Sequence, residues 1–340
     1  MLKNKFILGI ETSCDETSAA VIKDNQVYAN IISSQEIHEQ FGGVVPELAS
    51  RAHIRLIVSI VDRALHASGI KKHEIGGIAV TYGPGLVGAL LVGLNFSKGL
   101  AMGLGIPFIG VNHMEGHIYG NILTNPGITF PHLSLVVSGG HTMLILMKKH
   151  LDYEIIGKTR DDAVGEAFDK GAKMLGLGYP GGPLIDQLAA AGDPEFHSFP
   201  RAYLKGKTYD FSYSGLKTAM LVYLQSRSAK SVAENISHIC SSYQQAAIEV
   251  LVKKTVRAAL EYNVKSVGVV GGVAANSLLR WWLGEEIRRI NKAFFLPEFS
   301  YCTDNAAMIA RAGAQRLQAG EFSPQSLNAY PALRLGETKT

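Results

Sequence analysis

Two histidines with helical spacing are the most distinctive chemical feature of the sequence. In V-N-H-M-E-G-H-I-Y, His113 and His117 are four residues apart, so on a helix their side chains share one face and can bind one metal ion. In the peptidase motif H-E-x-x-H the glutamate follows the first histidine directly. Glu115 comes one position later, about 200° round a helix from His113, so we expect it to point away from a metal. The alternative is a pair of ordinary hydrogen-bonded helix histidines.

A metal site at these histidines needs a third ligand from elsewhere in the chain. Asp304, in T-D-N-A-A-M, lies at a predicted junction between a strand and a helix. Such a carboxylate can ligate a metal. The alternative is that it caps the helix, which is the commoner role of an aspartate at that position.

Two glycine-containing turns are candidates for binding an anion or a nucleotide. The turn Ser138-Gly139-Gly140 offers backbone N–H groups to an anion, although a plain hairpin would also use glycines for positive φ. In V-V-G-G-V-A-A-N, paired glycines and Asn276 join a strand to a helix start, where phosphates often bind. Close packing of the helix on the strand is the alternative. The pattern is not G-x-G-x-x-G, so a dinucleotide-binding fold is unsupported.

A third bend, Y-P-G-G-P-L-I-D, contains Gly182 and precedes a predicted helix that carries Asp186. Glycines there would let a planar ligand approach the backbone, and Asp186 can accept a hydrogen bond from a ribose hydroxyl. Asp169, in E-A-F-D-K, is a second candidate acceptor. For both acids a solvated helix face is the alternative.

The elements that position these residues alternate between strands and helices, which indicates an α/β fold. Residues 6–10 and 19–22 form two predicted strands around a polar turn, and residues 133–147 repeat that pattern around S-G-G-H-T. This duplication suggests two related lobes. Further strands are predicted over 76–82, 106–112 and 294–300, and residues 266–276 are predicted as a strand that runs through Gly271-Gly272 into a helix. Helices are predicted over 48–69, 161–176 and 231–262, with another beginning at Asp304.

Composition places few limits on function. The chain has 340 residues and a net charge of +4, which permits a polyanionic partner without requiring one. The apolar run from Leu86 to Phe96 is too short for a bilayer, which needs about 20 residues. The three cysteines show no disulfide or zinc-finger spacing, so we expect a cytoplasmic protein without membrane contact. Cys14 lies beside Asp15 and Glu16, which disfavour a thiolate.

Taken together and in order, the motifs closely resemble the tRNA N6-adenosine threonylcarbamoyltransferase family of bacterial type, once labelled a sialoglycoprotein endopeptidase. The resemblance extends from about residue 6 to about residue 317. It rests on I-E-T-S-C-D-E-T, G-G-V-V-P-E-L-A-S-R, G-P-G-L-V-G-A-L-L-V-G, N-H-M-E-G-H, V-S-G-G-H-T, G-E-A-F-D-K, Y-P-G-G-P, F-S-Y-S-G-L-K-T, G-G-V-A-A-N and C-T-D-N-A-A-M-I-A.

The resemblance implies two actin-like lobes of the sugar kinase, heat-shock ATPase and actin superfamily. We expect residues 1–130 with 307–340 in one lobe and 131–306 in the other, with metal and adenylate in the cleft between them. It implies one divalent metal, Fe²⁺ or Zn²⁺, on His113, His117 and Asp304. The implied substrate contacts are Val136, Val137, Ser138, Gly139, Gly140, Asp169, Gly182, Asp186 and Asn276. No covalent nucleophile is expected, and the Ser138–Gly140 turn would stabilise developing negative charge.

The implied reaction transfers a threonylcarbamoyl group from threonylcarbamoyl-adenylate to N6 of adenosine 37, in tRNAs that read codons beginning with A, and releases AMP. The implied partners are tRNA, a shorter actin-like paralogue and a small P-loop ATPase. An actin-like ATPase or small-molecule kinase is one alternative, although Mg²⁺ prefers oxygen ligands to a histidine pair. A metallopeptidase and a non-catalytic scaffold are the others.

Overall fold

The computed structural model describes residues 5–35, 44–204 and 206–337. The chain divides into two compact units. The first unit comprises residues 1–127, 150–152 and 297–340, and the second comprises 128–149 and 153–296. The lobes expected from the sequence would place residues 297–306 in the second unit. The observed division places them, and Asp304 with them, in the first.

A mixed sheet forms the centre of the first unit, with strand order β3-β2-β1-β4-β5. β1 (Phe6–Glu11), β2 (Thr17–Lys23) and β3 (Gln26–Ser33) are antiparallel neighbours, and β4 (Ile75–Gly83) and β5 (Phe108–Asn112) add in parallel. The apolar runs predicted as strands at 6–10, 19–22 and 76–82 lie in the core of this sheet. β3 was not predicted.

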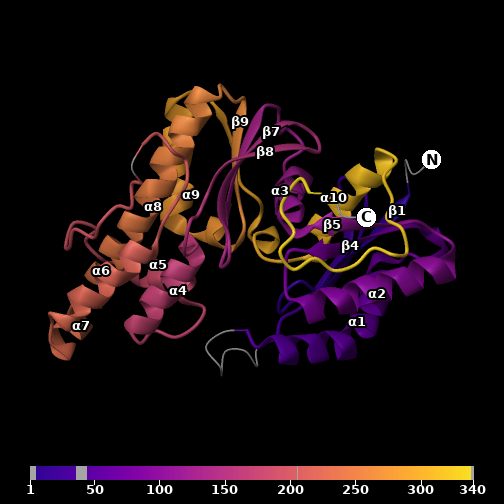
Figure 1. Ribbon diagram of the computed structural model, residues 1–340, viewed down its shortest axis with the longest axis horizontal. Helices are drawn as coiled ribbons and strands as arrows, with labels where there is room; N and C mark the ends of the chain where they lie inside the picture. Colours follow the sequence, from indigo (N-terminus) through magenta and orange to yellow (C-terminus); the bar gives the residue numbers. More distant parts are fainter. Residues whose placement is uncertain (1–4, 36–43, 205, 338–340) are drawn as a thin grey trace. The chain divides into compact units, whose positions relative to one another are not determined.

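Helices cover both faces of this sheet. α1 (Pro46–Ser68) and α2 (Val87–Leu104) lie side by side on one face, and α10 (Ala306–Gln318) lies on the other, against α3 (His113–Thr124) (Figure 1). A β-carbon added at Gly9 of β1 would lie 2.2 Å from the carbonyl oxygen of Ala306. Glycine at position 9 is therefore what lets α10 begin so close to the sheet.

Of the described helices, α2 is long and apolar enough to cross a bilayer by length and composition alone. The apolar run considered in the sequence stops at Phe96, whereas the helix continues to Leu104. Core helices pass the same test, and α2 packs against β4, β5 and α1 with Leu90 and Leu94 fully buried. Its apolar residues are thus used at least in part for the core of the first unit.

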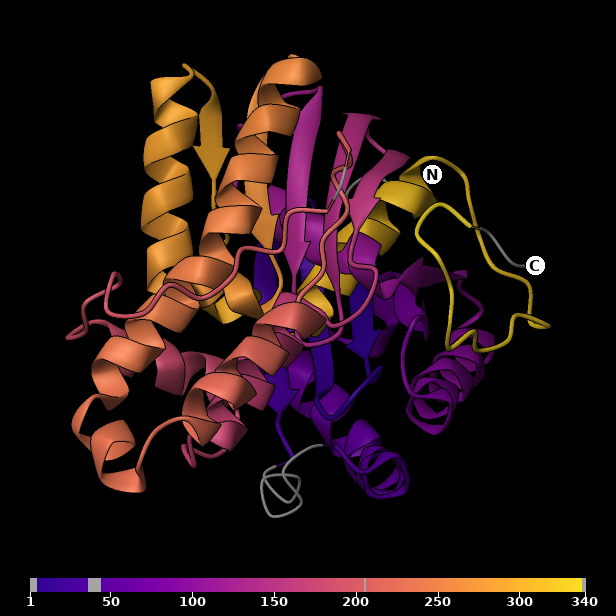
Figure 2. The ribbon, with the colours of Figure 1, turned by 60° about the vertical axis from the view of Figure 1, so that its left-hand side comes forward.

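The second unit repeats the same sheet plan, with strand order β10-β9-β6-β7-β8. The strands are β6 (His132–Val137), β7 (Thr142–Lys149), β8 (Asp152–Lys158), β9 (Ser266–Val270) and β10 (Ala293–Phe295). The helices are α4 (Val164–Met174), α5 (Gly181–Ala189), α6 (Ser214–Gln225), α7 (Ala229–Glu234), α8 (Ile236–Glu261) and α9 (Ser277–Arg289). α8 and α9 lie side by side in Figures 1 and 2.

The prediction of an α/β fold with a duplicated hairpin is confirmed, with one correction. The strand expected over 294–300 ends at Phe295, because Pro297 has no N–H to donate to a ladder. The strand expected before Gly271-Gly272 ends at Val270. Gly271 turns the chain there with a φ of 93°, and a short 3₁₀ helix, Gly272–Ala275, follows.

Candidate functional site

The two histidines lie at the start of α3, directly after β5. The side chain of Asn112 caps this helix, its Oδ1 accepting hydrogen bonds from the N–H groups of Met114 at 2.9 Å and Glu115 at 3.4 Å. The cap begins the helix at His113, so His113 and His117 fall one turn apart on one face. Both side chains are buried.

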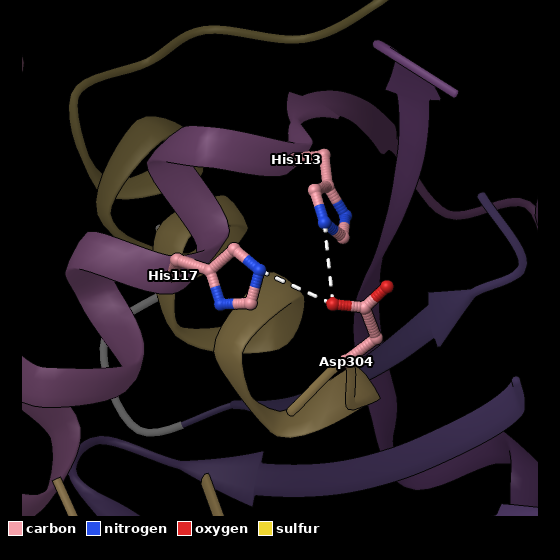
Figure 3. Close-up of side chains that lie close together, drawn as sticks. All are labelled: His113, His117 and Asp304. Atoms are coloured by element: carbon pink, nitrogen blue, oxygen red, sulfur yellow. Dashed lines mark ion pairs between the residues drawn. The ribbon is translucent and has the colours of Figure 1, made fainter. Parts of the chain in front are cut away.

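Asp304 reaches these histidines from the segment before α10. Its Oδ1 lies 3.3 Å from Nε2 of His113 and 3.2 Å from Nε2 of His117 (Figure 3). The ligand atoms of the three residues all lie within 4.8 Å of one another. The cap of α10 is Asn305, whose Oδ1 accepts from Met308 N–H at 3.1 Å. The alternative that Asp304 serves as the helix cap is therefore wrong.

The three side chains fit a metal ion. Both ring nitrogens of His117 are buried and make no well-aligned hydrogen bond within the described residues, and the polar atom facing Nε2 is Asp304 Oδ1 at 3.2 Å. A buried nitrogen left in this state costs free energy, and a metal on Nε2 would satisfy it. A set of two imidazole nitrogens and one carboxylate oxygen suits Zn²⁺ or Fe²⁺ better than Mg²⁺.

A second carboxylate orients His113. Nδ1 of His113 lies 3.1 Å from Glu11 Oε2 and 3.1 Å from Ser13 Oγ, so the ring donates from Nδ1 and leaves Nε2 for a metal. Burial alone would lower the pKa of His113, but Asp304 and Glu11 outweigh it and raise this pKa well above its ordinary value. Burial likewise opposes ionisation of Asp304, yet His113 holds the pKa of Asp304 well below its usual range.

Sequence reasoning gave no role at this site to Glu11 or Ser13. Glu11 is the last residue of β1, and Ser13 lies in the polar turn that follows. The sequence interpretation treated this segment only as a connection between strands. A carboxylate at the end of an otherwise apolar strand, as Glu11 is, was the available signal.

Glu115 has a structural role, as its spacing suggested. Its carboxylate is fully buried and accepts hydrogen bonds from Nε of Arg316 at 2.8 and 3.1 Å. Arg316 also pairs with Glu321, with 2.5 Å between Nη1 and Oε2. This ion pair joins α3 to α10, the helices next to the metal ligands, and it occupies the carboxylate that a peptidase would need as a base.

The expectation that Cys14 is not a nucleophile is supported by its surroundings. Burial and the neighbouring carboxylate of Asp15 raise the pKa of the Cys14 thiol far above its ordinary value. A thiol in this state is a poor nucleophile.

In the second unit, the turn between β6 and β7 presents an open stretch of backbone. Ser138 closes the turn by donating its N–H to the His141 carbonyl at 2.8 Å and accepting His141 N–H on Oγ at 3.1 Å. Gly139 and Gly140 are exposed, neither has a positive φ, and a β-carbon on either would meet nothing within 4 Å. The alternative that these glycines supply positive φ is wrong. Val136 and Val137 are buried, so only their backbone can face a ligand.

Two other glycines bring neighbouring segments against this turn. A β-carbon at Gly271 would lie 2.4 Å from the Val137 carbonyl oxygen, and one at Gly165 would lie 2.5 Å from that of Ser138. The end of β9 and the start of α4 therefore both touch the β6–β7 turn. Within the second unit, the structure thus brings together the turn, the α4 helix that carries Asp169 and the segment that leads to Asn276.

The two candidate acids are already hydrogen-bonded, rather than lying on solvated helix faces. Asp169 Oδ1 accepts from Gly181 N–H at 2.8 Å, at the start of α5. Asp186 Oδ2 accepts from Ser277 N–H at 3.0 Å, and its Oδ1 accepts from Ser277 Oγ at 2.7 Å and from Asn276 Nδ2 at 3.2 Å. These bonds hold the bends next to Gly182 and Asn276 in place.

Asn276 also makes protein hydrogen bonds through both its side-chain oxygen and its side-chain nitrogen. Its Oδ1 caps α9 by accepting from Leu279 N–H at 3.0 Å, and its Nδ2 donates to Gln244 Oε1 at 2.9 Å as well as to Asp186. Gln244 is buried in α8, and sequence reasoning missed it because nothing in S-S-Y-Q-Q distinguishes it from an ordinary helix residue.

Comparison with known proteins identifies the family. A family model described as "TsaD: tRNA N6-adenosine threonylcarbamoyltransferase" matches residues 26–311. The chain belongs to this family. The tRNA N6-adenosine threonylcarbamoyltransferase of Caldicellulosiruptor bescii is 51% identical over 337 residues, which cover 98% of this chain and 100% of that protein.

Two solved structures share the fold of this family member. Full-length HypF, in a phosphate- and nucleotide-bound form, aligns with a TM-score of 0.62 at 14% identity, covering 94% of this chain and 56% of HypF. Component A of the Acidaminococcus fermentans (R)-2-hydroxyglutaryl-CoA dehydratase aligns with a TM-score of 0.54 at 15% identity, covering 93% of this chain and 100% of component A. The prediction of a two-lobed, actin-like α/β fold is confirmed. As a member of the threonylcarbamoyltransferase family, the chain is a transferase, so the kinase, peptidase and scaffold alternatives are not favoured.

Proposed function

We propose that the chain transfers the threonylcarbamoyl group of threonylcarbamoyl-adenylate to N6 of adenosine 37 in tRNAs that read codons beginning with A. The observation that carries this proposal is the meeting of His113, His117 and Asp304 in a member of the threonylcarbamoyltransferase family. The amine attacks the carbamoyl carbon and loses a proton, the bond from that carbon to the phosphate oxygen breaks, and AMP leaves.

The metal proposed on His113, His117 and Asp304 is Fe²⁺ or Zn²⁺. When bound, it would supply Lewis-acid polarisation of the carbamoyl carbonyl. The chain's own contribution is to orient the side chains that would bind the metal. Glu11 and Ser13 lie within hydrogen-bond distance of Nδ1 of His113, and both imidazoles are buried. In the unloaded protein the raised pKa of His113 implies that metal binding displaces a proton, so affinity falls as the pH is lowered.

The adenylate is proposed to bind the second unit, on Val136–Gly140, Gly182 and Asn276. The open surroundings of Gly139 and Gly140 support this assignment. Neither packing nor φ requires glycine at these positions, whereas close approach of a ligand to the backbone would require it. Their N–H groups are proposed to stabilise the negative charge that develops on the carbamoyl oxygen. Because Asp169 and Asp186 already accept protein hydrogen bonds, we propose that they shape this site, with any ribose contact made through remaining lone pairs.

The proposed partners follow from the family. They are tRNA, a shorter actin-like paralogue and a small P-loop ATPase, in the cytoplasm. Contacts to tRNA phosphates would make binding salt-dependent. α1 is the candidate docking face for a protein partner, since Ile54 and Val58 are 64% and 59% exposed on it.

The proposal is tested by incubating the metal-loaded protein and its partners with tRNA and threonylcarbamoyl-adenylate. We expect threonylcarbamoyladenosine in the digested tRNA and an equal amount of AMP, measured by mass spectrometry and chromatography. Transfer of a γ-phosphoryl group from ATP to a small molecule, with unmodified tRNA, would contradict it.

A further inference from the structure

His53 connects α1 to the turn beside the candidate metal site. It is fully buried, and both ring nitrogens are bonded. Nε2 lies 3.0 Å from the Cys14 carbonyl oxygen, and Nδ1 lies 2.8 Å from Thr17 Oγ1. A carbonyl can only accept, so Nε2 carries the proton and Nδ1 accepts from the Thr17 hydroxyl. The imidazole therefore binds the middle of the β1–β2 connection, at Cys14, and the first residue of β2, Thr17.

The same connection contacts the metal ligand His113. Ser13, next to Cys14, places its Oγ 3.1 Å from His113 Nδ1. On the side of α2, the Ser13 carbonyl accepts from Leu86 N–H at 2.8 Å, and a β-carbon at Gly85 would lie 2.5 Å from that carbonyl oxygen. The turn is thus confined by α2 through Ser13 and by α1 through His53.

We propose that His53 is a positioning residue for His113. By holding the Cys14 carbonyl, it fixes the turn so that Ser13 Oγ and Glu11 keep the His113 ring in the orientation that directs Nε2 toward Asp304. Groups that orient a ligating histidine without touching the metal commonly change metal affinity by about 10- to 100-fold. The inference rests on the proposed metal site. The competing explanation is that His53 only fastens α1 to the sheet.

Two substitutions at position 53 separate these explanations, because each keeps one of the two hydrogen bonds. His53→Gln can still donate to the Cys14 carbonyl from a position close to that of Nε2. His53→Asn can still accept from Thr17 but no longer reaches Cys14. Thr17→Val removes the Thr17 contact alone and is the matched control for His53→Gln. Zn²⁺ affinity is measured by competition with a chromogenic chelator, alongside the visible spectrum of the Co²⁺-loaded protein and thermal unfolding.

We expect His53→Asn to weaken Zn²⁺ binding by about tenfold and to alter the Co²⁺ spectrum. His53→Gln and Thr17→Val should stay within about threefold of the wild type, even where their melting temperatures fall as far as that of His53→Asn. Equal affinities in His53→Asn and His53→Gln would overturn the proposal, and so would affinities that simply follow the melting temperatures.

A measurement on the wild type avoids any failure of variants to fold. With ¹⁵N-labelled histidine, Zn²⁺ titration should shift the ring signals of His53 together with those of His113 and His117. The signals of His132, a buried histidine of the second unit, should stay in place. A His53 signal that stays still while His113 responds would refute the coupling. If the wild type binds no Zn²⁺ or Fe²⁺, the proposed metal site itself is wrong, which is a different result.

Discussion

The two units share one sheet plan and differ in the turn that follows the first strand of each sheet. In each, an antiparallel set of three strands is extended by two parallel strands, as β1 to β5 and again as β6 to β10. The first hairpin turn is polar and acidic, T-S-C-D-E, and lies beside the histidines. The matching turn of the second unit is S-G-G-H, with little more than backbone to offer. The same sheet plan thus carries two turns of different chemistry, one beside the candidate metal ligands and one in the proposed adenylate site.

In both units a glycine with positive φ packs closely against this part of the chain. The chain leaves β4 through Gly85 and β9 through Gly271, both with positive φ. A β-carbon would lie 2.5 Å from the Ser13 carbonyl oxygen in the first unit and 2.4 Å from the Val137 carbonyl oxygen in the second. Because each unit has such a glycine, the two turns differ mainly in their side chains.

The largest expected effect is confined to the first unit. Asp304→Ala removes the carboxylate that lies within 3.3 Å of both imidazoles. We expect loss of stoichiometric metal and a fall of more than about 100-fold in tRNA modification, with a folded second unit. Metal analysis and nucleoside analysis measure this, with His73→Ala, an exposed histidine, as the control. Undiminished modification by a metal-free variant would show that this part of the first unit is not a metal site.

The next effect tests the ion pair that joins α3 to α10. Glu115→Gln leaves Arg316 largely buried without its full counter-charge, which should lower the free energy of unfolding by about 3 kcal/mol in urea denaturation. Metal content per folded molecule should stay unchanged, because the described hydrogen bonds of the Glu115 carboxylate go to Arg316. Glu47→Gln, which breaks an exposed pair with Arg51, is the control and should cost under about 0.5 kcal/mol. Peptide-bond cleavage by the wild type that is lost in folded Glu115→Gln would revive the peptidase alternative.

Adjacent glycines sharpen the comparison in the second unit. Gly271→Ala places a side chain at positive φ against the Val137 carbonyl and should destabilise by about 2 kcal/mol or more, as should Gly85→Ala in the first unit. Gly272 is exposed and a β-carbon there would meet nothing within 4 Å. Gly272→Ala should therefore keep its melting temperature and raise the KM for the adenylate. An unchanged KM would show that the segment around Gly272 is not part of the proposed adenylate site.

The smallest effect is a pH dependence, and it has opposite signs in the two units. Burial lowers the pKa of His132 from its ordinary 6.5 to about 3. Between these values the unfolded chain binds a proton that the folded chain does not, so stability falls as pH falls, by at most about 1.4 kcal/mol per pH unit. For metal-free His113, whose pKa is raised, the stabilising term is present at low pH and lost as pH rises.

Urea denaturation between pH 7 and pH 5 of the wild type and of His132→Gln measures the second-unit term. The variant should lose less stability over this range than the wild type. Parallel slopes would mean that His132 is not held neutral in the folded protein.

Much of the fold was predictable from local pattern. Buried strands such as residues 6–10 and the hairpin at 133–147 are apolar runs bounded by polar turns, and they formed as expected. β3 and β8 were missed because Gln26–Ser33 and Asp152–Lys158 mix polar and apolar residues, and their pairing depends on a neighbouring strand.

The sites were predictable only in part. Spacing alone indicated the pair His113 and His117, but Asp304 joined them through the family resemblance, since no local rule connects residues so far apart in the chain. The bonds of Asp186 and Asn276 are tertiary contacts between separate helices, so a sequence pattern could suggest a ligand role without showing that both are already engaged.

The close packing of α10 on β1 has a consequence for synthesis. Asp304 is made long after both imidazoles, and it reaches them only when the following helix docks against Gly9. A growing chain on the ribosome therefore carries both histidines of the proposed metal site before it carries the carboxylate. Metal binding at this site should begin only after residues 304–318 have left the exit tunnel and α10 has packed against β1.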